Sequence, residues 1–403
     1  MGGGGEGGGA RIGEVFLAFL KLGCTSFGGP IAHLGYFRAE FVHRRRWLDD
    51  AAYADLVALS QFLPGPASSQ VGIAIGLLHA GWLGSLAAWL AFTLPSAALM
   101  IAFASGLSVW GAAVAPAVHG LVVAAVAVVA VAVLGMARTL CPDRLRAGIA
   151  LATAMLMLIV PGGLATPASF VAVVLGAVVG IGFVAADPVA IGASAALEVV
   201  VGRRTGAALL AAFATVLVGL PLLAAAIGSD DLRMASVFYR AGALVFGGGH
   251  VVLPWLEAGI VGAGWLDPGT FFAGYGAAQA VPGPLFTFAA YLGALLPVLA
   301  GGVAGGVAML VAIFLPAYLL VVGALPFWTA VRARRNARTA MAGVNAAVVG
   351  LLLAALVTPL ATTALHSFTD VALAAAAFAA LWFGRWPSVL VVALAAFAGW
   401  ALG

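Results

Sequence analysis

Charge is scarce in this sequence. Asp, Glu, Lys and Arg make up 8% of its 403 residues, whereas soluble domains carry roughly 25%. Hydrophobic residues make up 64% of the chain, and the mean hydropathy is +1.16. This composition excludes a soluble or disordered protein and indicates a polytopic helical protein of the lipid bilayer. The alternation of polar and apolar residues that a transmembrane barrel needs is missing as well.

Lysine and cysteine are nearly missing. Lys21 is the only lysine, and no basic stripe alternates with aromatic residues, which argues against a nucleic-acid partner. Cys24 and Cys141 stand alone, without the spacing of a metal site. Phosphate-binding loops, zinc-spaced histidines and nucleophile elbows are also absent. We therefore expect no enzyme activity, no metal, no cofactor and no ATPase domain, so that any transport is powered by gradients.

The sequence contains one series of motifs twice, at an offset of 218 or 219 residues. The first copy reads Phe27-Gly28-Gly29-Pro30, Trp47-Leu48-Asp49 and Gln61-Phe62-Leu63-Pro64-Gly65-Pro66. The second reads Phe246-Gly247-Gly248-Gly249, Trp265-Leu266-Asp267 and Gln279-Ala280-Val281-Pro282-Gly283-Pro284. A weaker echo pairs Thr93-Leu94-Pro95-Ser96 with Phe314-Leu315-Pro316-Ala317. Helix breakers duplicated in apolar sequence point to the substrate site of a transporter.

Apolar segments and their breakers divide the chain into two repeats and a linker. We expect a flexible Gly-rich tail over 1–11, a first repeat over 12–185, a linker over 186–233 with one extra transmembrane segment, and a second repeat over 234–403. An odd number of crossings between the copies would invert the second repeat. The apolar segments fall at 12–43, 51–79, 82–109, 112–136, 145–160, 168–185, 206–226, 234–261, 269–298, 300–323, 340–361, 368–383 and 387–402.

The distribution of arginine supports this inversion. Basic clusters occur at 38–46 and 332–338. Their counterparts in the other copy, 261–267 and 109–116, have no basic residue. Under the positive-inside rule, opposite placement of arginine is the signature of inverted repeats. The predicted fold class is therefore an all-α polytopic membrane protein with two inverted-topology repeats and broken or re-entrant helices at the Gly-Gly-Pro and Pro-Gly-Pro motifs.

Re-entrance of the motif segments would place every basic cluster on one side of the membrane. Glycine permits non-helical dihedrals, and proline removes a backbone donor, so each motif breaks a helix into two arms. We expect four such hairpins, two in each copy, because 12–43 and 51–79 are long enough to supply two half-helices each. The alternative is a single kinked span at each breaker.

A half-helix that restarts after a breaker presents free N–H groups and its positive end, which suits an anion. Hydroxyls and an amide follow Pro66 directly, at Ser68, Ser69 and Gln70. The alternatives are packing kinks for the glycine motifs and helix caps for Gln61 and Gln279. The substrate-binding candidates at the breakers are Ser26, Phe27, Gly28, Gly29, Pro30, Gln61, Pro64, Gly65, Pro66, Ser68, Ser69, Gln70, Phe246, Gly247, Gly248, Gly249, Gln279, Pro282, Gly283 and Pro284.

Charged and titratable residues near the breakers extend this set. Lys21 and Arg240 are equivalent in the repeat, and a charge at membrane depth suggests function, so we expect them to hold the anion from each half. Snorkelling to the interface is the alternative. His33 and His250 adjoin the glycine motifs and are candidates for substrate binding or proton coupling, with packing as the alternative. The remaining proton-coupling candidates are Asp55 and Glu257.

At these residues the chain resembles the chromate ion transporter family in its long-chain, two-copy form. The resemblance covers nearly everything from Phe16 onward and is carried by 22–33, 44–49, 61–70, 243–250 and 279–284. It implies export of chromate, conferring resistance, by a multi-pass protein of the bacterial cytoplasmic (inner) membrane. Chromate and sulfate are similar tetrahedral dianions, so proton-coupled import of sulfate or another oxyanion, and an oxyanion channel, stay open. A homodimer also stays open, because small residues are too widespread to locate an interface.

Overall fold

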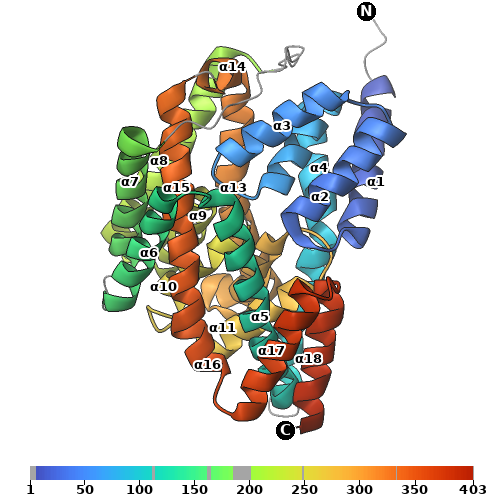
Figure 1. Ribbon diagram of the computed structural model, residues 1–403. Helices are drawn as coiled ribbons and strands as arrows, with labels where there is room; N and C mark the ends of the chain where they lie inside the picture. Colours follow the sequence, from blue (N-terminus) through green and yellow to red (C-terminus); the bar gives the residue numbers. More distant parts are fainter. Residues whose placement is uncertain are drawn as a thin grey trace, which may run out of the picture.

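The computed structural model describes residues 6–110, 114–160, 165–184, 201–246, 249–332 and 334–402. These residues form helices and no strand, which confirms the all-α, polytopic prediction (Figure 1). Within this part of the chain, five helical stretches are long and apolar enough to cross a membrane: Ala67–Leu107, Ala115–Leu140, Arg203–Ile227, Gly302–Val331 and Arg335–Ala364.

The first Gly-Gly-Pro motif separates two antiparallel arms. Helix α1 (Glu6–Thr25) descends to the motif, and α2 (Gly29–Phe37) with the π-helical turn η1 (Arg38–Arg44) returns beside it. The arms are joined by an ion pair of 2.9 Å between Arg45 and Glu14 and by stacking of Phe19 on Phe41, with ring centroids 4.7 Å apart. The two ends of this hairpin therefore lie beside each other.

The first Pro-Gly-Pro motif also separates two arms. Helix α3 (Asp50–Phe62) precedes the motif and α4 (Ala67–Trp110) follows it, but α4 reverses direction at Ala80–Gly81. The 13 residues of α3 span about 20 Å, and the arm 67–79 is equally long, whereas the hydrocarbon core of a bilayer is about 30 Å thick. Trp47 stacks on His79, with ring centroids 3.8 Å apart, so the end of the second arm lies beside the start of the first.

The second half breaks at the corresponding places. Helix α9 (Asp230–Ala243) is followed by η4 (Gly249–Val251) and α10 (Val252–Ile260), and α11 (Pro268–Ala280) by η5 (Leu285–Thr287) and α12 (Phe288–Leu295). Tyr291 of α12 donates to the carbonyl of Thr270 in α11 at 2.8 Å, so these arms are antiparallel too. After η6 (Val298–Ala300), α13 (Gly302–Ala324) packs on α12 where Gly293 meets Gly305, as Gly76 meets Gly84 in α4.

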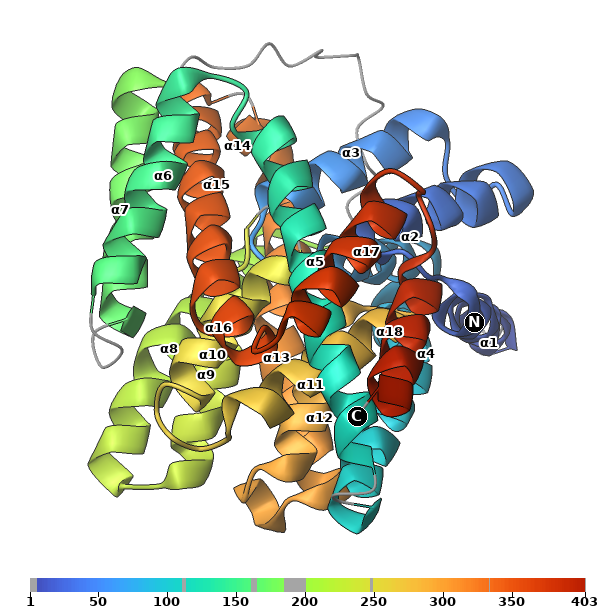
Figure 2. The ribbon, with the colours of Figure 1, turned by 60° about the horizontal axis from the view of Figure 1, so that its bottom comes forward.

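The final helices of each half pack against the other half. Helix α15 (Arg335–Ala355) packs on α6 (Arg144–Ile159) and α7 (Ala165–Phe183), whereas α5 (Ala115–Leu140) packs on α17 (Phe368–Trp382) and α18 (Ser388–Leu402) (Figure 2). Backbones approach closely at glycines, where Gly343 meets Gly176 and Gly120 meets Ala395. Such contacts between small residues are a common way to associate helices in membranes. The short segments between α13 and α17 are η7 (Leu325–Phe327), α14 (Trp328–Arg332), η8 (Leu356–Ala361) and α16 (Thr362–Ala364).

Helix α8 (Arg203–Ile227) is the extra segment expected in the linker. It packs on α9 and α13 and otherwise exposes apolar side chains, with Val218 at 61% and Leu222 at 66% exposure. An apolar surface of this kind belongs in contact with lipid.

Two predicted boundaries differ from the structure. Helix α1 begins at Glu6, inside the predicted tail 1–11, because the helix that packs on α4 continues toward the N-terminus. Helix α9 begins at Asp230, before the predicted start of the second repeat at 234, because Ser229 caps it by accepting from the N–H of Leu232. Residues 186–200 of the predicted linker lie outside the described residues, as does residue 185 at the end of the predicted first repeat.

Candidate functional site

Each Pro-Gly-Pro loop is hydrogen-bonded to the glycine motif of the other half. The N–H of Gly65 donates to the carbonyl of Val245 at 2.6 Å, and the N–H of Gly283 donates to the carbonyl of Ser26 at 2.9 Å. Pro30 and Gly249 also adjoin each other. The structure thus brings the four breakers together from hairpins that are far apart in the sequence. We call this region the breaker centre.

The two central glycines have backbone conformations that other residues rarely adopt. Gly65 has a φ of +125° and Gly283 a φ of +100°. A Cβ on Gly65 would lie 2.7 Å from Nε2 of Gln70, and one on Gly283 would lie 2.8 Å from Oγ of Ser96. Glycine is therefore required here both by dihedral angle and by space.

Buried polar groups gather where α4 restarts after the first Pro-Gly-Pro loop. Ser68, Ser69 and Gln70 are 2%, 2% and 0% exposed. Gln70 donates to the carbonyl of Pro64 at 2.7 Å. Among the described residues, Oγ of Ser69, Oε1 of Gln70 and Oγ of Ser26 have no hydrogen-bond partner. Unpartnered polar atoms are costly in a dry interior, so this cluster suits a polar ligand that reaches the helix start.

The two histidines near the glycine motifs have different surroundings. His33 is buried, with Nδ1 3.3 Å from Oγ of Ser68 and Nε2 3.2 Å from the carbonyl of Ser26. His250 lies with Nδ1 2.7 Å from the hydroxyl of Tyr275. His33 therefore belongs to the breaker centre, whereas His250 joins η4 to α11.

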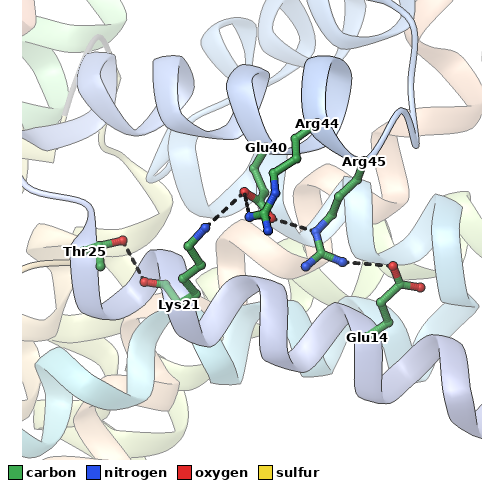
Figure 3. Close-up of polar contacts among 6 residues, drawn as sticks. All are labelled: Glu14, Lys21, Thr25, Glu40, Arg44 and Arg45. Carbon is green, nitrogen blue, oxygen red and sulfur yellow. Dashed lines mark hydrogen bonds and ion pairs between the residues drawn. The ribbon is translucent and has the colours of Figure 1, made fainter.

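Lys21 is engaged at the side of the first hairpin. Its ammonium lies 3.5 Å from Glu40, and its side chain is 54% exposed (Figure 3). Glu40 also accepts from Arg44 at 3.0 Å and from Arg45 at 2.7 Å. Burial raises the pKa of the Glu40 carboxyl, but hydrogen bonds from Arg45 and Arg44 and the charge of Lys21 outweigh it, so that the pKa lies below its ordinary value of 4.5.

The predicted partner of Lys21 lies elsewhere. Arg240 lines a cavity between α8 and α9 and donates from Nε to the carbonyl of Ser236 at 3.4 Å. Glu257 lines a separate cavity of about 220 Å³ between α10, α15 and the end of α6. Asp55 is buried in α3. The sequence predicts that Lys21 and Arg240 hold the anion, one from each half; their contacts place Lys21 beside Glu40 and Arg240 in the α8–α9 cavity.

The remaining predicted residues differ in burial. Pro66 and Pro284 are buried, Phe27, Gly29, Pro64, Phe246 and Pro282 are half-buried, and Gly28 is exposed with a φ of +99°. Gln61 is exposed, while the Nε2 atom of Gln279 is buried without a partner among the described residues. Gly247 and Gly248 lie outside the described residues.

Sequence reasoning missed several residues that enclose the breaker centre. Ser96 of α4 lies against Gly283, and Ala317 of α13 lies against Gly65. Phe92 packs edge-on against His33, with ring centroids 5.3 Å apart. The third repeated motif, around Pro95 and Pro316, contains Ser96 and Ala317 and carried the signal that identifies them.

Comparisons with known proteins agree with the duplicated architecture. The sequence model of the family described as Chromate transporter matches residues 13–183 and 232–400. The chain is 29% identical to a probable chromate transport protein of Synechococcus elongatus, over 94% of this chain and 93% of the relative. It is also 29% identical to a chromate transport protein of Pseudomonas aeruginosa, over 96% and 91%. No solved structure matches.

Proposed function

The chain belongs to the chromate transporter family, and on that premise we propose that it is a secondary transporter that exports chromate from the bacterial cytoplasm. It acts as a carrier rather than an enzyme, in the cytoplasmic membrane, with its basic clusters inside. The observation that carries this proposal is the breaker centre, where Gly65 bonds to Val245 and Gly283 bonds to Ser26. Discontinuous helices that meet in this way are typical of substrate sites in transporters.

The chemistry of the breaker centre favours a tetrahedral oxyanion. Helix α4 restarts at Ala67 with its N–H groups and positive end directed at the junction. The hydroxyl groups of Ser26 and Ser69 are buried and lack partners among the described residues. An oxyanion accepts hydrogen bonds on all its oxygens, so these donors would replace part of its hydration shell. This site supplies dipoles and hydroxyls rather than full charges.

We propose that the two halves are inverted repeats and that access alternates by rocking of the hairpins against the long helices. Support comes from the reciprocal hydrogen bonds at the centre and from the exchanged packing of α15 on α6 and α7 and of α5 on α17 and α18. The arms of α3 and α11, with 13 residues each, are shorter than a membrane span.

Export follows from the energetics of a dianion. Moving one charge through 100 mV is worth about 2.3 kcal/mol, so a dianion leaving an inside-negative cell gains about 4.6 kcal/mol. This energy supports a concentration ratio on the order of a thousandfold. Export therefore needs no coupling ion, whereas uptake of the same dianion needs two protons to be electroneutral.

A proton-coupled exchanger or importer of sulfate or another oxyanion is the second candidate. Glu257 favours it, because its carboxyl lines a largely apolar cavity and no described residue forms a hydrogen bond or ion pair with it. A carboxyl in such a place exchanges protons more readily than a paired one.

The test is movement of radiolabelled chromate in proteoliposomes under an imposed potassium-diffusion potential, with sulfate as competitor. We expect flux toward the positive side that follows the potential without a pH gradient. Dependence on the pH gradient alone would select the proton-coupled candidate. A conductance far above carrier turnover would identify a channel, and the absence of any anion flux beyond protein-free liposomes would refute transport.

A further inference from the structure

A polar cavity lies between α8 and α9, away from the breaker centre. Its volume is about 420 Å³, and its α8 wall consists of small and apolar residues. The α9 wall carries Arg233, Ser236 and Arg240, with Ser229 and Asp230 at the α8–α9 turn. The sequence predicts an anion-holding role for Arg240 but for no other residue that lines this cavity.

The arginines of this cavity lack anionic partners. Arg233 and Arg240 lie seven residues apart, hence on one face of α9. Among the described residues, neither forms an ion pair, and the Arg240 guanidinium donates to the carbonyl of Ser236 at 3.4 Å. Asp230 is the one acidic residue among those that line the cavity, against two arginines. Arg233 is exposed and Arg240 is half-buried, and a half-buried guanidinium such as that of Arg240 is costly without a counter-charge.

Ser236 provides an independent sign of a ligand. It lies between the two arginines on the same helix face and lines the cavity. Its side chain is 2% exposed, and its hydroxyl has no hydrogen-bond partner among the described residues. A hydroxyl flanked by two guanidinium groups would complete the coordination of a tetrahedral oxyanion.

In the first half of the chain, the charged residues at the equivalent positions form ion pairs, whereas Arg233 and Arg240 form none among the described residues. Glu14 and Lys21 occupy the positions equivalent to Arg233 and Arg240, at the common offset of 219 residues. There the charges are neutralised internally, because Glu14 binds Arg45 and Lys21 binds Glu40 (Figure 3). In the second half, Glu257 lines a different cavity from the two arginines. A counter-charge for the two arginines is therefore expected from outside the protein, since Asp230, the one carboxylate that lines their cavity, forms an ion pair with neither of them.

We propose that the α8–α9 cavity is a second oxyanion site, in which Arg233, Arg240 and the Ser236 hydroxyl hold a tetrahedral anion. The α8 residues that line the cavity begin at Pro221, 18 residues (221 − 203) after the basic start of that helix, which is about 27 Å along its axis, so the site opens toward the face opposite the basic clusters. Arg240 lies five residues before Val245 of the breaker centre, which makes the cavity a vestibule for the transported anion. That last role rests on the proposed function, whereas binding itself does not.

Arginine-directed labelling tests this site without measuring transport. Purified protein in phosphatidylcholine nanodiscs is treated with phenylglyoxal, and modified arginines are mapped by mass spectrometry. We expect sulfate to slow labelling of Arg233 and Arg240 at least tenfold, while chloride of equal ionic strength does not. Arg203, which is exposed at the start of α8, is the internal control. The Ser236→Ala variant, which removes one donor and little volume, should lose part of the protection.

The oxyanion is either a free dianion or the phosphate of a lipid, and the lipid composition distinguishes them. Protection by sulfate in phosphatidylcholine alone identifies a free dianion. Protection by phosphatidylglycerol that sulfate does not increase identifies a lipid phosphate. Labelling that neither anion slows would overturn the proposal. If the arginines are protected in a protein that moves no anion, the second site stands and only the transport function is refuted. If they are unprotected in a protein that transports chromate, the transport function stands and the second site is refuted.

Discussion

His33 connects the two breakers of the first half, because its imidazole contacts Oγ of Ser68 at 3.3 Å and the carbonyl of Ser26 at 3.2 Å. The same carbonyl accepts the N–H of Gly283 from the second half. One side chain thus supports three of the four segments that meet at the breaker centre. The aligned position in the second half is Val251, so this support has no counterpart there.

Replacing His33 by alanine should loosen the breaker centre. The substitution leaves the Ser68 hydroxyl unpaired and opens space beside Phe92, at a cost of about 1–3 kcal/mol. We expect a lower melting temperature in detergent and a tenfold or greater loss of chromate flux. His366→Ala, at a connection near α17, is the matched control and should retain flux. Full activity in His33→Ala would show that the centre does not depend on this residue.

Gly283→Ala should impair transport more than any alanine substitution at an unconstrained glycine. A side chain at a φ of +100° and 2.8 Å from Ser96 strains the loop by about 1–3 kcal/mol. We expect loss of flux with the protein still inserted in the membrane. Gly135→Ala in α5, where nothing lies within 4 Å, should be neutral or slightly stabilising. Equal flux in the two variants would contradict the role of the loop.

Arg240 and Lys21 should respond unequally to neutralisation, although the repeat makes them equivalent. Arg240→Gln removes a cation that forms no ion pair among the described residues, so flux should fall at least tenfold. Lys21→Gln breaks an ion pair in which the lysine is 54% exposed, and such pairs contribute little. We expect a change of no more than about threefold, measured as initial rates in proteoliposomes at matched protein content. A larger loss of flux in Lys21→Gln than in Arg240→Gln would support Lys21 as the residue that holds the anion.

Glu40 gives a pH signature outside the membrane spans. Its pKa is lower in the folded protein than the ordinary 4.5, so its contribution to stability is present above that value and is lost as the pH falls through the folded pKa. Glu40→Gln should therefore melt below the wild type at pH 7, and the difference should shrink as the pH falls below 4.5. Asp50→Asn, which removes an exposed pair with Arg38, should change little. A difference that does not depend on pH would exclude the ionised carboxyl as its source.

Helix limits were the most predictable part of the fold. The segments 82–109, 206–226 and 300–323 correspond to the second part of α4, to α8 and to α13, because apolar runs and glycine or proline breakers act locally. Helix ends at the Gly-Gly-Pro and Pro-Gly-Pro motifs follow from backbone chemistry for the same reason.

Side-chain partners across the hairpins were not predictable. Whether Lys21 faces the breaker centre or Glu40 depends on the register between two antiparallel arms, and the repeat does not encode that register. Equivalent positions also diverged in charge, from Glu14 to Arg233, so symmetry of the backbone does not extend to the side chains. The packing of α15 on α6 and α7 of the other half was not predictable either, since contacts between small residues carry little sequence information.

The hydrogen bonds from Gly65 to Val245 and from Gly283 to Ser26 make each half the complement of the other. A single half would leave a loop donor and a motif acceptor unsatisfied in an apolar medium, and it would lack the helices that pack on its own α5 or α15. The two halves therefore relate to each other as the subunits of an obligate heterodimer do, joined here by a covalent tether. Cut between α7 and α8 and produced as separate chains, they should assemble together and fail alone.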